Sequence, residues 1–379
     1  MVGGIVLKKN RLLVVGLLAL FVTGCTNTDQ DADSSSEVMS SEVNSESSSE
    51  ESSSMPESEE SSSEEETASI GDYFPFMESI YSSYLGDGIE YSSYELYPQY
   101  IEENRIQYVE KNSGTNIVTV LEYTDGQLVE KFVRPETYFR ENMLDKTSEN
   151  AGNILLQEPL EVGNNWENPS GGTVEITAVD VDVETPLGVF PSIEVTTTEE
   201  NSINIRYYSM GVGLVKKVAT DTEGSYEVTS TLEEQTEETP EAATIKVFFP
   251  DANAMGIETA DVSVAFFTND VTRETMTELL RQVPDVEYGR LIPEDASINS
   301  MYLNEDGRVY VDFSQELVAN MNAGSSGESL LLQGIVNTIG TYYGVEEVVL
   351  TIEGAPYESG HYSMQEDESF KVDMEGVAE

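Results

Sequence analysis

Residues 325–352 read SSGESLLLQGIVNTIGTYYGVEEVVLTI, and this stretch decides the fold of the C-terminal part of the chain. Its apolar positions recur at helical spacing on one face: Leu331, Leu332, Ile335 and Ile339. Ser325 and Glu328 have the spacing of a capping box, which predicts that the helix begins there. Gly344 is the expected stop signal. Glu347–Ile352 is apolar and β-branched, so a strand should follow the helix directly.

The segments before this stretch predict a compact α+β module. Its expected strands are Thr244–Phe249, Val262–Phe267, Ser297–Leu303 and Arg308–Phe313. Asn269 or Asp270 is placed to cap a further helix, which Pro284 ends. The apolar face of that helix contains Met276, Leu279 and Leu280. The long helix between two strands makes a right-handed crossover the expected connection.

The module from about Ala243 to Tyr357 resembles the GerMN domain, named for sporulation and spore-germination lipoproteins of Gram-positive bacteria. The stretches that carry the resemblance are LIPE (291–294), VYVDFS (309–314), GESLLLQGIVNTI (327–339) and VVLTIEG (348–354). Their order and spacing agree with the family, and the resemblance covers about a third of the chain. It implies an α+β domain with a small sheet and two helices on one face.

The resemblance also implies a role in assembly rather than in a reaction. GerMN domains are similar to the ring-building modules of the channel between mother cell and forespore. There, copies or relatives pack side by side, and such heterologous contacts close into rings when the rotation permits. The best-known sporulation member has two such domains in tandem, whereas here a β domain takes the place of one. Single-domain relatives also occur in bacteria that make no spores.

Residues 70–232 predict an all-β N-terminal domain. The expected strands are Arg105–Val109, Asn116–Tyr123, Leu128–Val133, Thr173–Val183, Ser192–Thr198, Asn204–Tyr208, Leu214–Ala219 and Tyr226–Leu232. Thr124–Gln127 suits a hairpin turn. Trp166 is expected to anchor the core of this domain. The pair Gly211 and Gly213 predicts a turn, because no third glycine or helix start follows to make a nucleotide loop.

Tyrosine is concentrated between residues 81 and 100. The tyrosines are Tyr81, Tyr84, Tyr91, Tyr94, Tyr97 and Tyr100. They form either a buried stripe or an aromatic binding face. Tyrosines of this kind are more often partly buried packing residues, so we favour the core interpretation.

Three low-complexity segments flank the two domains. Residues 25–69 contain a lone cysteine and a Ser/Glu-rich linker, which is expected to be disordered because it has too little apolar surface to fold. Roughly 44 flexible residues span about 35–40 Å, enough to act as a spacer. Residues 233–242 are predicted to be a second acidic linker, and residues 358–379 a loosely ordered acidic tail.

The first 24 residues read as a secretory signal peptide, and Cys25 as a lipidation site. Lys8, Lys9 and Arg11 precede an apolar run that is too short to span a bilayer. Small residues directly before the only cysteine resemble a bacterial lipobox, where cleavage leaves a diacylated cysteine. This predicts attachment to the cell membrane through diacylglyceryl-Cys25, on the extracytoplasmic face of a Gram-positive type envelope. The alternative is an uncleaved anchor with an incidental cysteine.

The charge balance excludes nucleic-acid binding. The chain has 18 Lys+Arg against 72 Asp+Glu, a formal net charge of -54, so it repels phosphate backbones. The acids are spread along the whole chain, which favours a solvated surface suited to high salt or high external pH. Weak cation binding or attraction to a basic partner is the alternative.

No arrangement of residues indicates a catalytic centre or a cofactor. His361 is the only histidine and Cys25 the only cysteine, which removes most metal sites and leaves a single base for a catalytic triad. Asp29, Asp31 and Asp33 begin like a calcium loop, but the later glycine and glutamate are missing. We therefore predict no catalytic, metal-binding or cofactor-binding residues. A carboxylate-pair wall hydrolase remains the least favoured alternative.

Four polar residues of the C-terminal module have two interpretations each. Asp312 and Ser314 lie at a strand end, where a capping or turn role is favoured over a binding site. Asn337 and Thr338 lie in mid-helix and either bond a neighbouring backbone or mark a polar contact with a partner domain.

The sequence therefore predicts a membrane-anchored extracytoplasmic lipoprotein that is not an enzyme. Its GerMN-like domain should contact a protein partner or self-assemble, in spore formation or germination. The alternative is a general envelope lipoprotein whose β domain binds a wall glycan, peptide or lipid.

Overall fold

The computed structural model describes residues 68–149, 151–251, 253, 255–282 and 290–378. The signal peptide, Cys25, most of the Ser/Glu-rich linker and Pro284 lie outside the described residues, so what the sequence predicts for them stays a prediction. Residues from Ala68 onward belong to one compact unit. We call residues 68–236 the β lobe and residues 241–378 the C-terminal lobe.

The β lobe is a single antiparallel sheet of twelve strands. Its strands are β1 (Tyr81–Asp87), β2 (Tyr94–Glu102), β3 (Arg105–Asn112), β4 (Asn116–Thr124), β5 (Gln127–Arg134), β6 (Asn153–Gln157), β7 (Asn165–Glu167), β8 (Thr173–Thr185), β9 (Gly188–Thr198), β10 (Ser202–Ser209), β11 (Gly213–Asp221) and β12 (Glu227–Thr236). The strand order is β6-β5-β4-β3-β2-β1-β12-β11-β10-β9-β8-β7. Each of the eight predicted strands is present, and β1, β2, β6 and β7 are additional.

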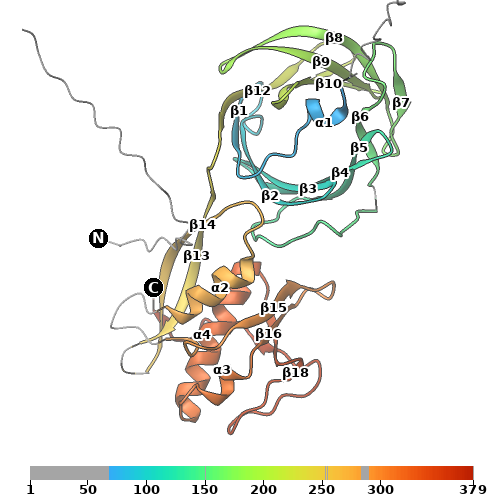
Figure 1. Ribbon diagram of the computed structural model, residues 1–379. Coiled ribbons are helices and arrows are strands. Elements are labelled where there is room, and N and C mark those ends of the chain that lie inside the picture. The colour runs from blue at the N-terminus through green and yellow to red at the C-terminus, as the bar shows by residue number, and fades with distance from the viewer. Residues whose placement is uncertain (1–67, 150, 252, 254, 283–289, 379) are drawn as a thin grey trace, which may run out of the picture. The chain divides into compact units, whose positions relative to one another are not determined.

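The sheet curls until its two end strands, β6 and β7, meet (Figure 1). The indole N–H of Trp166 in β7 donates to the carbonyl of Ile154 in β6 at 3.0 Å. The backbone N–H of Ile154 in turn donates to the side-chain oxygen of Asn168 at 2.8 Å. Trp166 also packs in the buried cluster inside the curl, which confirms its predicted role as a core anchor. Short helix α1 (Ile70–Tyr73) lies within the ring of strands in Figure 1.

Two predicted turns of the β lobe are confirmed. Asp125 and Gly126 connect β4 to β5 with φ of 49° and 71°, the left-handed conformation that a tight hairpin requires. Gly211 and Gly213 lie in the β10–β11 connection with φ of 75° and 95°. They belong to a hairpin and not to a nucleotide loop.

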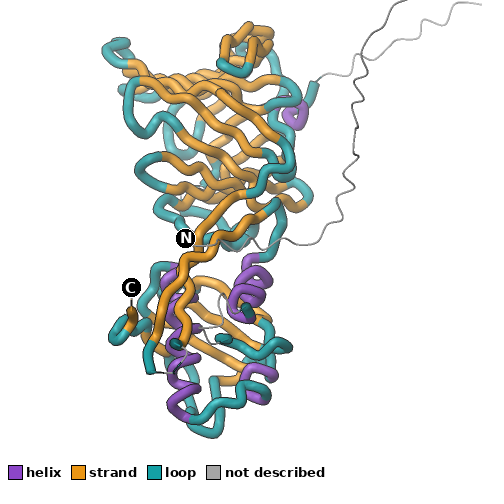
Figure 2. Tube along the Cα trace, turned by 90° about the vertical axis from the view of Figure 1, so that its left-hand side faces the viewer, coloured by secondary structure: helices purple, strands orange, loops and turns teal. Residues whose placement is uncertain are grey.

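The C-terminal lobe consists of two small sheets and three helices. One sheet contains β13 (Glu241–Pro250), β14 (Ile257–Phe266) and β20 (Val377–Ala378). The other contains β15 (Ile298–Leu303), β16 (Val309–Phe313), β17 (Glu347–Ile352), β18 (Ala355–Pro356) and β19 (Phe370–Lys371). The helices are α2 (Thr272–Arg281), α3 (Glu316–Ala319) and α4 (Ser325–Tyr343). Figure 2 shows that, apart from α1, the helices are confined to this lobe.

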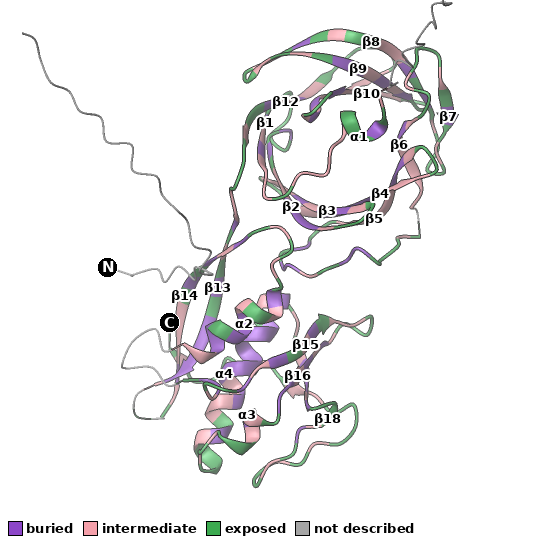
Figure 3. Ribbon diagram, viewed as in Figure 1, coloured by how far each residue is buried: buried purple, intermediate pink, exposed green. Residues whose placement is uncertain are grey.

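Helix α4 contacts strands of both small sheets, which differs from the expected single sheet with two helices on one face. Figure 3 shows its first turns partly exposed and its second half mostly buried, where residues 334–340 are all buried. Its glycines permit the close approach: a Cβ on Gly334 would lie 2.7 Å from the Phe248 carbonyl oxygen in β13. A Cβ on Gly340 would lie 2.3 Å from the Val372 side chain and 3.2 Å from the Val345 carbonyl oxygen. The predicted stop at Gly344 is confirmed by its φ of 69°.

Two helix starts differ from the sequence prediction. Helix α2 begins after Val271, which is its N-cap in place of the predicted Asn269 or Asp270. Instead, the Asn269 side chain accepts a hydrogen bond from Ile101 N–H of the β lobe at 2.8 Å. The capping box at Ser325 is also absent, because Gly324 is the N-cap of α4 and the Glu328 side chain points elsewhere.

The acidic linker and tail are more ordered than the sequence indicates. Of the expected linker at residues 233–242, only residues 237–240 lie between β12 and β13. The expectation of a loosely ordered tail is wrong, since Phe370–Lys371 pairs with β17 and Val377–Ala378 pairs with β14. Parallel pairing of β16 with β17 around α4 agrees with the expected crossover.

The two lobes share one hydrophobic cluster. Four buried residues of the curled sheet, Tyr100, Val109, Val118 and Val120, belong to the same cluster as the core of the C-terminal lobe. The connection between β5 and β6 adds Phe139, Met143 and Leu144 to it. Because burial of apolar surface is the main driving force of folding, this continuity joins the two lobes energetically.

Arg140 is the polar centre of this interface. Its side chain is buried, with 3% of the residue exposed. On the β-lobe side, the guanidinium donates to the Gln99 carbonyl at 2.6 Å and to the Tyr100 hydroxyl at 2.8 Å. On the C-terminal side, it donates to the carbonyls of Phe267, at 3.1 Å, and Asp270.

A carboxylate and an aromatic ring also contact the Arg140 side chain. Its Nε lies 3.7 Å from a carboxylate oxygen of Glu241, which also pairs with Lys111 at 2.8 Å. The guanidinium lies 4.2 Å from the ring centroid of Tyr100, a distance that permits a cation–π interaction. A buried cation is tolerated when most of its donors find acceptors, and here the two terminal nitrogens of the guanidinium bond acceptors from both lobes. The Nε atom has no hydrogen-bond partner among the described residues and has only the ion pair with Glu241.

We predict that Arg140→Met lowers the free energy of unfolding of residues 68–379 by about 3 kcal/mol, because several buried carbonyls lose a charged donor. Chemical denaturation followed by circular dichroism measures this change. The matched control is Lys246→Gln, because Lys246 and Asp261 are 47% and 60% exposed and 3.5 Å apart. That exposed pair should contribute less than about 1 kcal/mol. Equal effects of the two substitutions would contradict the role given to Arg140.

Candidate functional site

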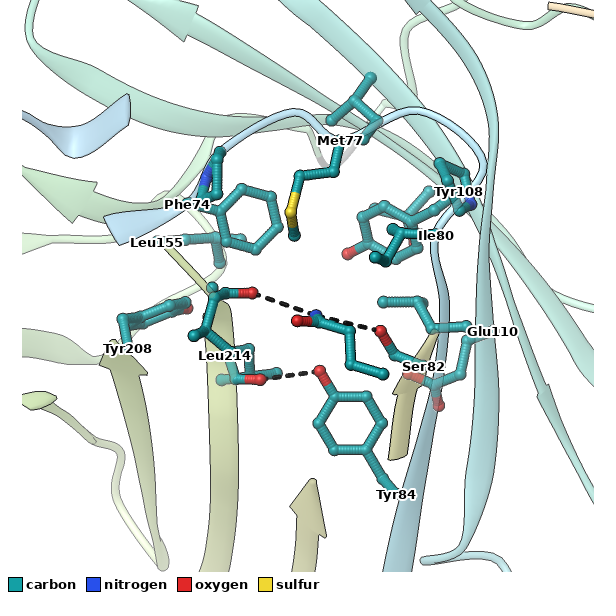
Figure 4. A pocket seen from close by; sticks show the side chains of 18 of the residues that line it. Phe74, Met77, Ile80, Ser82, Tyr84, Tyr108, Glu110, Leu155, Tyr208 and Leu214 are labelled. Carbon is teal, nitrogen blue, oxygen red and sulfur yellow. Dashed lines mark hydrogen bonds between the residues drawn. The ribbon is translucent and has the colours of Figure 1, made fainter. Parts of the chain in front are cut away.

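A cavity of about 220 Å³ lies inside the curled sheet of the β lobe. Figure 4 shows that Phe74, Met77 and Ile80, from the segment between α1 and β1, lie across one side of it. Tyr84 and Tyr208 line it from strands β1 and β10. A space of this size accommodates roughly seven water molecules or a small ligand.

Two stacked tyrosines form part of the cavity wall. The rings of Tyr84 and Tyr94 stack with centroids 4.4 Å apart. The Tyr84 hydroxyl donates to the Leu214 carbonyl at 2.8 Å, as Figure 4 shows. The Tyr94 hydroxyl is buried and has no hydrogen-bond partner among the described residues.

The tyrosine-rich segment therefore divides into three environments. Tyr84, Tyr94 and Tyr100 are buried, as the favoured core interpretation predicts. Tyr81 and Tyr97 are partly buried, and Tyr91 is 49% exposed. Tyr84 and Tyr94 fit both the buried-stripe and the binding-face interpretation, because these core residues also line the cavity.

Four charged residues line the same cavity. Lys217 in β11 lies 3.3 Å from the Glu110 carboxylate in β3, and its ammonium lies 3.9 Å from the ring centroid of Tyr94. Arg206 in β10 is the direct cross-strand neighbour of Lys217. Glu130 in β5 accepts a hydrogen bond from Asn153 at 3.2 Å. No sequence argument selected these four residues.

Desolvation dominates the protonation equilibria of the cavity. Burial lowers the pKa of Lys217, although the Glu110 carboxylate partly opposes the change. Burial raises the pKa of Glu130, against the hydrogen bond from Asn153 and the positive charge of Arg206. Burial also raises the pKa of Tyr94 far above its ordinary value, so its hydroxyl stays protonated and able to donate.

A second polar cluster lies in the C-terminal lobe, around the buried carboxylate of Glu328. The Tyr357 hydroxyl donates to it at 2.7 Å, and His361 Nδ1 lies 2.5 Å from its other oxygen. Burial acts to raise the pKa of Glu328. Hydrogen bonds from Ser359, Tyr357 and His361 outweigh burial, so this pKa lies below its ordinary value.

The pairing of His361 with Glu328 does not complete a catalytic triad. Among the described residues, no serine or threonine side chain forms a hydrogen bond with the remaining ring nitrogen of His361. The cluster instead ties the C-terminal segment to the first turn of α4. In the part of the chain that the structure describes, no group of three or more His, Cys, Asp or Glu side chains is arranged to hold a metal ion.

The four polar residues singled out from the sequence have structural roles. Asp312 accepts hydrogen bonds from the Thr351 hydroxyl at 2.6 Å and from Gly354 N–H at 2.7 Å, which holds the β17–β18 turn. Ser314 accepts from Ser297 N–H at 3.1 Å. These contacts agree with the favoured turn role.

Asn337 and Thr338 bond neighbouring backbone, the first of their two interpretations. The Thr338 hydroxyl accepts from Phe248 N–H at 3.0 Å, and so connects α4 to β13. The Asn337 amide bonds both backbone groups of Asp373 at 2.6 and 2.9 Å.

The predicted lipidation site Cys25 and the calcium-like residues Asp29, Asp31 and Asp33 lie outside the described residues, so what the sequence predicts for them stays a prediction. Within the described ranges, no helix is both long and apolar enough to cross a membrane.

Comparison with known proteins confirms the resemblance of the C-terminal lobe. Residues 246–358 match the Germane family model, described as sporulation and spore germination. No curated protein matches the chain.

Three solved structures resemble parts of the chain. The tandem GerMN domains of the sporulation protein GerM from Bacillus subtilis share 18% identity, cover 34% of this chain and 46% of that chain, and give a TM-score of 0.28. The first GerMN domain of the same protein shares 18% identity with this chain. The match covers 34% of this chain and 97% of that chain, with a TM-score of 0.25. An exported protein with a YmcC-like fold from Bacteroides fragilis shares 11% identity with this chain. The match covers 44% of this chain and 99% of that chain, with a TM-score of 0.28. This chain thus spans less than half of the tandem-domain chain.

We predict that Glu328→Gln lowers the free energy of unfolding at pH 7 by about 1.5 kcal/mol, because a buried charge-assisted network becomes neutral. A lowered folded-state pKa means that the carboxylate stabilises the fold above its ordinary pKa of 4.5, and that this stabilisation is lost as pH falls through the folded value. The difference between variant and wild type should therefore shrink below pH 4.5. Denaturation midpoints across pH measure it.

The control for this pH series is Glu358→Gln, an exposed acid of the same segment. It should change stability little at any pH. A difference for Glu328→Gln that does not vary with pH would contradict the account of this cluster.

Proposed function

We propose that this chain, whose residues 246–358 form a Germane domain, is a lipid-anchored protein on the outer face of the cytoplasmic membrane that assembles with other proteins in spore formation or germination. The observation that carries the proposal is the family match itself, whose description is sporulation and spore germination. The Germane domain is the assembling part, with copies of this chain or another envelope protein as its partner.

An edge strand of the Germane domain supports an assembly role. Strand β15 lies at one end of its sheet, and β16 is its strand partner among the described residues. At its two ends, Ile298 N–H donates to the Thr277 hydroxyl and Leu303 N–H to the Glu141 carboxylate, so the free edge is the middle of the strand. Its Tyr302 is 43% exposed and stacks on Tyr310 of β16 with ring centroids 5.8 Å apart. Exposed edge strands pair readily with other chains, and tyrosine is enriched among residues that dominate interface energies.

The predicted anchor and spacer support the envelope location. Cys25 would hold the chain at the membrane, and the Ser/Glu-rich segment would separate the folded lobes from the lipid surface. Net charge of -54 opposes direct contact between those lobes and anionic headgroups. The proposed protein therefore meets its partners at a distance from the bilayer.

We predict that a photo-crosslinking amino acid at Tyr302 captures a protein partner in intact cells, because this edge faces the proposed assembly contact. The control is the same amino acid at Tyr138, which is 60% exposed but belongs to the β lobe. Immunoblots for the chain after irradiation show the cross-linked species. Equal cross-linking at both positions, or none at Tyr302, would argue against an interface at this edge.

We also predict that deletion of this protein lowers the count of heat-resistant spores, or of spores that germinate, relative to the parent strain. Complementation with the wild-type chain should restore the count, whereas a Cys25→Ser chain should not, because it lacks the acylated residue. Unchanged spore formation and germination in the deletion strain would remove the sporulation part of the proposal. The cross-linking result would then decide whether an assembly role elsewhere in the envelope survives.

A further inference from the structure

The cavity of the β lobe places two cations directly opposite each other. Arg206 and Lys217 are cross-strand neighbours in β10 and β11, and both line the cavity. Like charges in this position repel each other. The whole chain has only 18 basic residues against 72 acidic ones, so two facing cations in one interior space require an explanation.

The donors that face the cavity are only partly satisfied. Lys217 has Glu110 as a partner at 3.3 Å. The Arg206 side chain has no hydrogen bond or ion pair to any other residue in the described part of the chain, although a guanidinium carries five N–H donors. The buried Tyr94 hydroxyl also lacks an acceptor among the described residues. Together these groups call for an external acceptor.

The charge of the lining limits what that acceptor can be. Arg206 and Lys217 balance Glu110 and Glu130 when all four are ionised. Burial favours the neutral forms of both Glu130 and Lys217, so it does not by itself change this balance. What an external group can satisfy is the set of donors on Arg206 and Tyr94 that have no partner among the described residues. These donors suit a small anionic group, and the balanced charge disfavours a polyanion.

The rest of the wall is mixed: Ser82, Thr119 and Gln235 are polar, and the Gln235 amide donates to the Ser82 hydroxyl and the Val212 carbonyl. The other part is apolar. Met77, Ile80, Leu155 and Leu214 line the cavity beside the tyrosine rings, and Figure 4 shows them around the same space. If only an anion were bound in the cavity, these apolar side chains would remain in contact with water. A ligand that combines an anionic group with a short aliphatic body would satisfy both parts of the wall.

We propose that the cavity of the β lobe binds a small amphiphile that has an anionic headgroup, either carboxylate or phosphate, and a short aliphatic chain. Arg206 and Tyr94 donate to the headgroup, Lys217 adds positive charge, and the aliphatic chain packs against Met77, Ile80, Leu155 and Leu214. This inference concerns a different lobe from the assembly role and does not depend on it.

Isothermal titration calorimetry on residues 68–379 tests the proposal with four probes: hexanoate, hexyl phosphate, hexanol and inorganic phosphate. Hexanoate or hexyl phosphate should bind, and whichever binds more tightly identifies a fatty-acid-like or a lipid-phosphate-like source. Hexanol lacks the charge and inorganic phosphate lacks the chain, so each should bind at least about tenfold more weakly.

Arg206→Gln is the decisive variant, because it removes the unpaired cation and leaves the Lys217–Glu110 pair intact. It should weaken binding of the tighter probe by about tenfold or more. The matched control is Lys216→Gln, since Lys216 precedes Lys217 in β11 but does not line the cavity. This control should bind like the wild type.

Tyr94→Phe provides a second variant in case Arg206→Gln fails to fold. It keeps the stacked ring and removes only a hydroxyl that has no partner among the described residues. It should fold normally and weaken binding by about threefold. The proposal is overturned if neither amphiphile binds, if hexanol or inorganic phosphate binds as tightly, or if the folded cavity variants bind like the Lys216→Gln control. Crosslinking at Tyr302 would be unaffected by any of these outcomes.

Discussion

The buried guanidinium of Arg140 is the interaction on which the arrangement of the two lobes depends. It donates to carbonyl oxygens of Gln99 in the β lobe and of Phe267 and Asp270 in the C-terminal lobe. An unpaired buried cation is far more costly than a paired one, so both sides of the interface must be in place together. The apolar residues around it belong to one cluster with the core of the Germane domain. The Germane domain is therefore built into a larger body and not suspended from a flexible linker.

The sequence predicted the local elements well, because their signals lie within a few residues. Helix α4, its stop at Gly344 and the β4–β5 turn follow from periodicity and glycine chemistry. It did not predict Arg140, whose acceptors come from segments far apart in the chain. The same limit explains Glu328: its spacing fits a capping box, but the tail brings Tyr357 and His361 to its carboxylate. Asn269 has a capping residue type, yet its side chain bonds a distant strand.

The sequence predicted the cavity of the β lobe only in part. Tyrosine spacing indicated that residues 81–100 are partly buried, but it could not place Tyr84 and Tyr94 beside Lys217, because the pairing of β1 with β12 joins opposite ends of the β lobe. A signal for Arg206 was present: it alternates with Tyr208 in a predicted strand, which places both on the same face. The two proposals thus concern different lobes, a small ligand inside the curled sheet and a protein contact at β15.

Arg140 and the shared core join these two lobes into one cooperative body. Differential scanning calorimetry of wild-type residues 68–379 should therefore show one unfolding transition whose calorimetric enthalpy equals its van't Hoff enthalpy. Two resolved transitions, or a calorimetric enthalpy well above the van't Hoff value, would show that the lobes unfold independently.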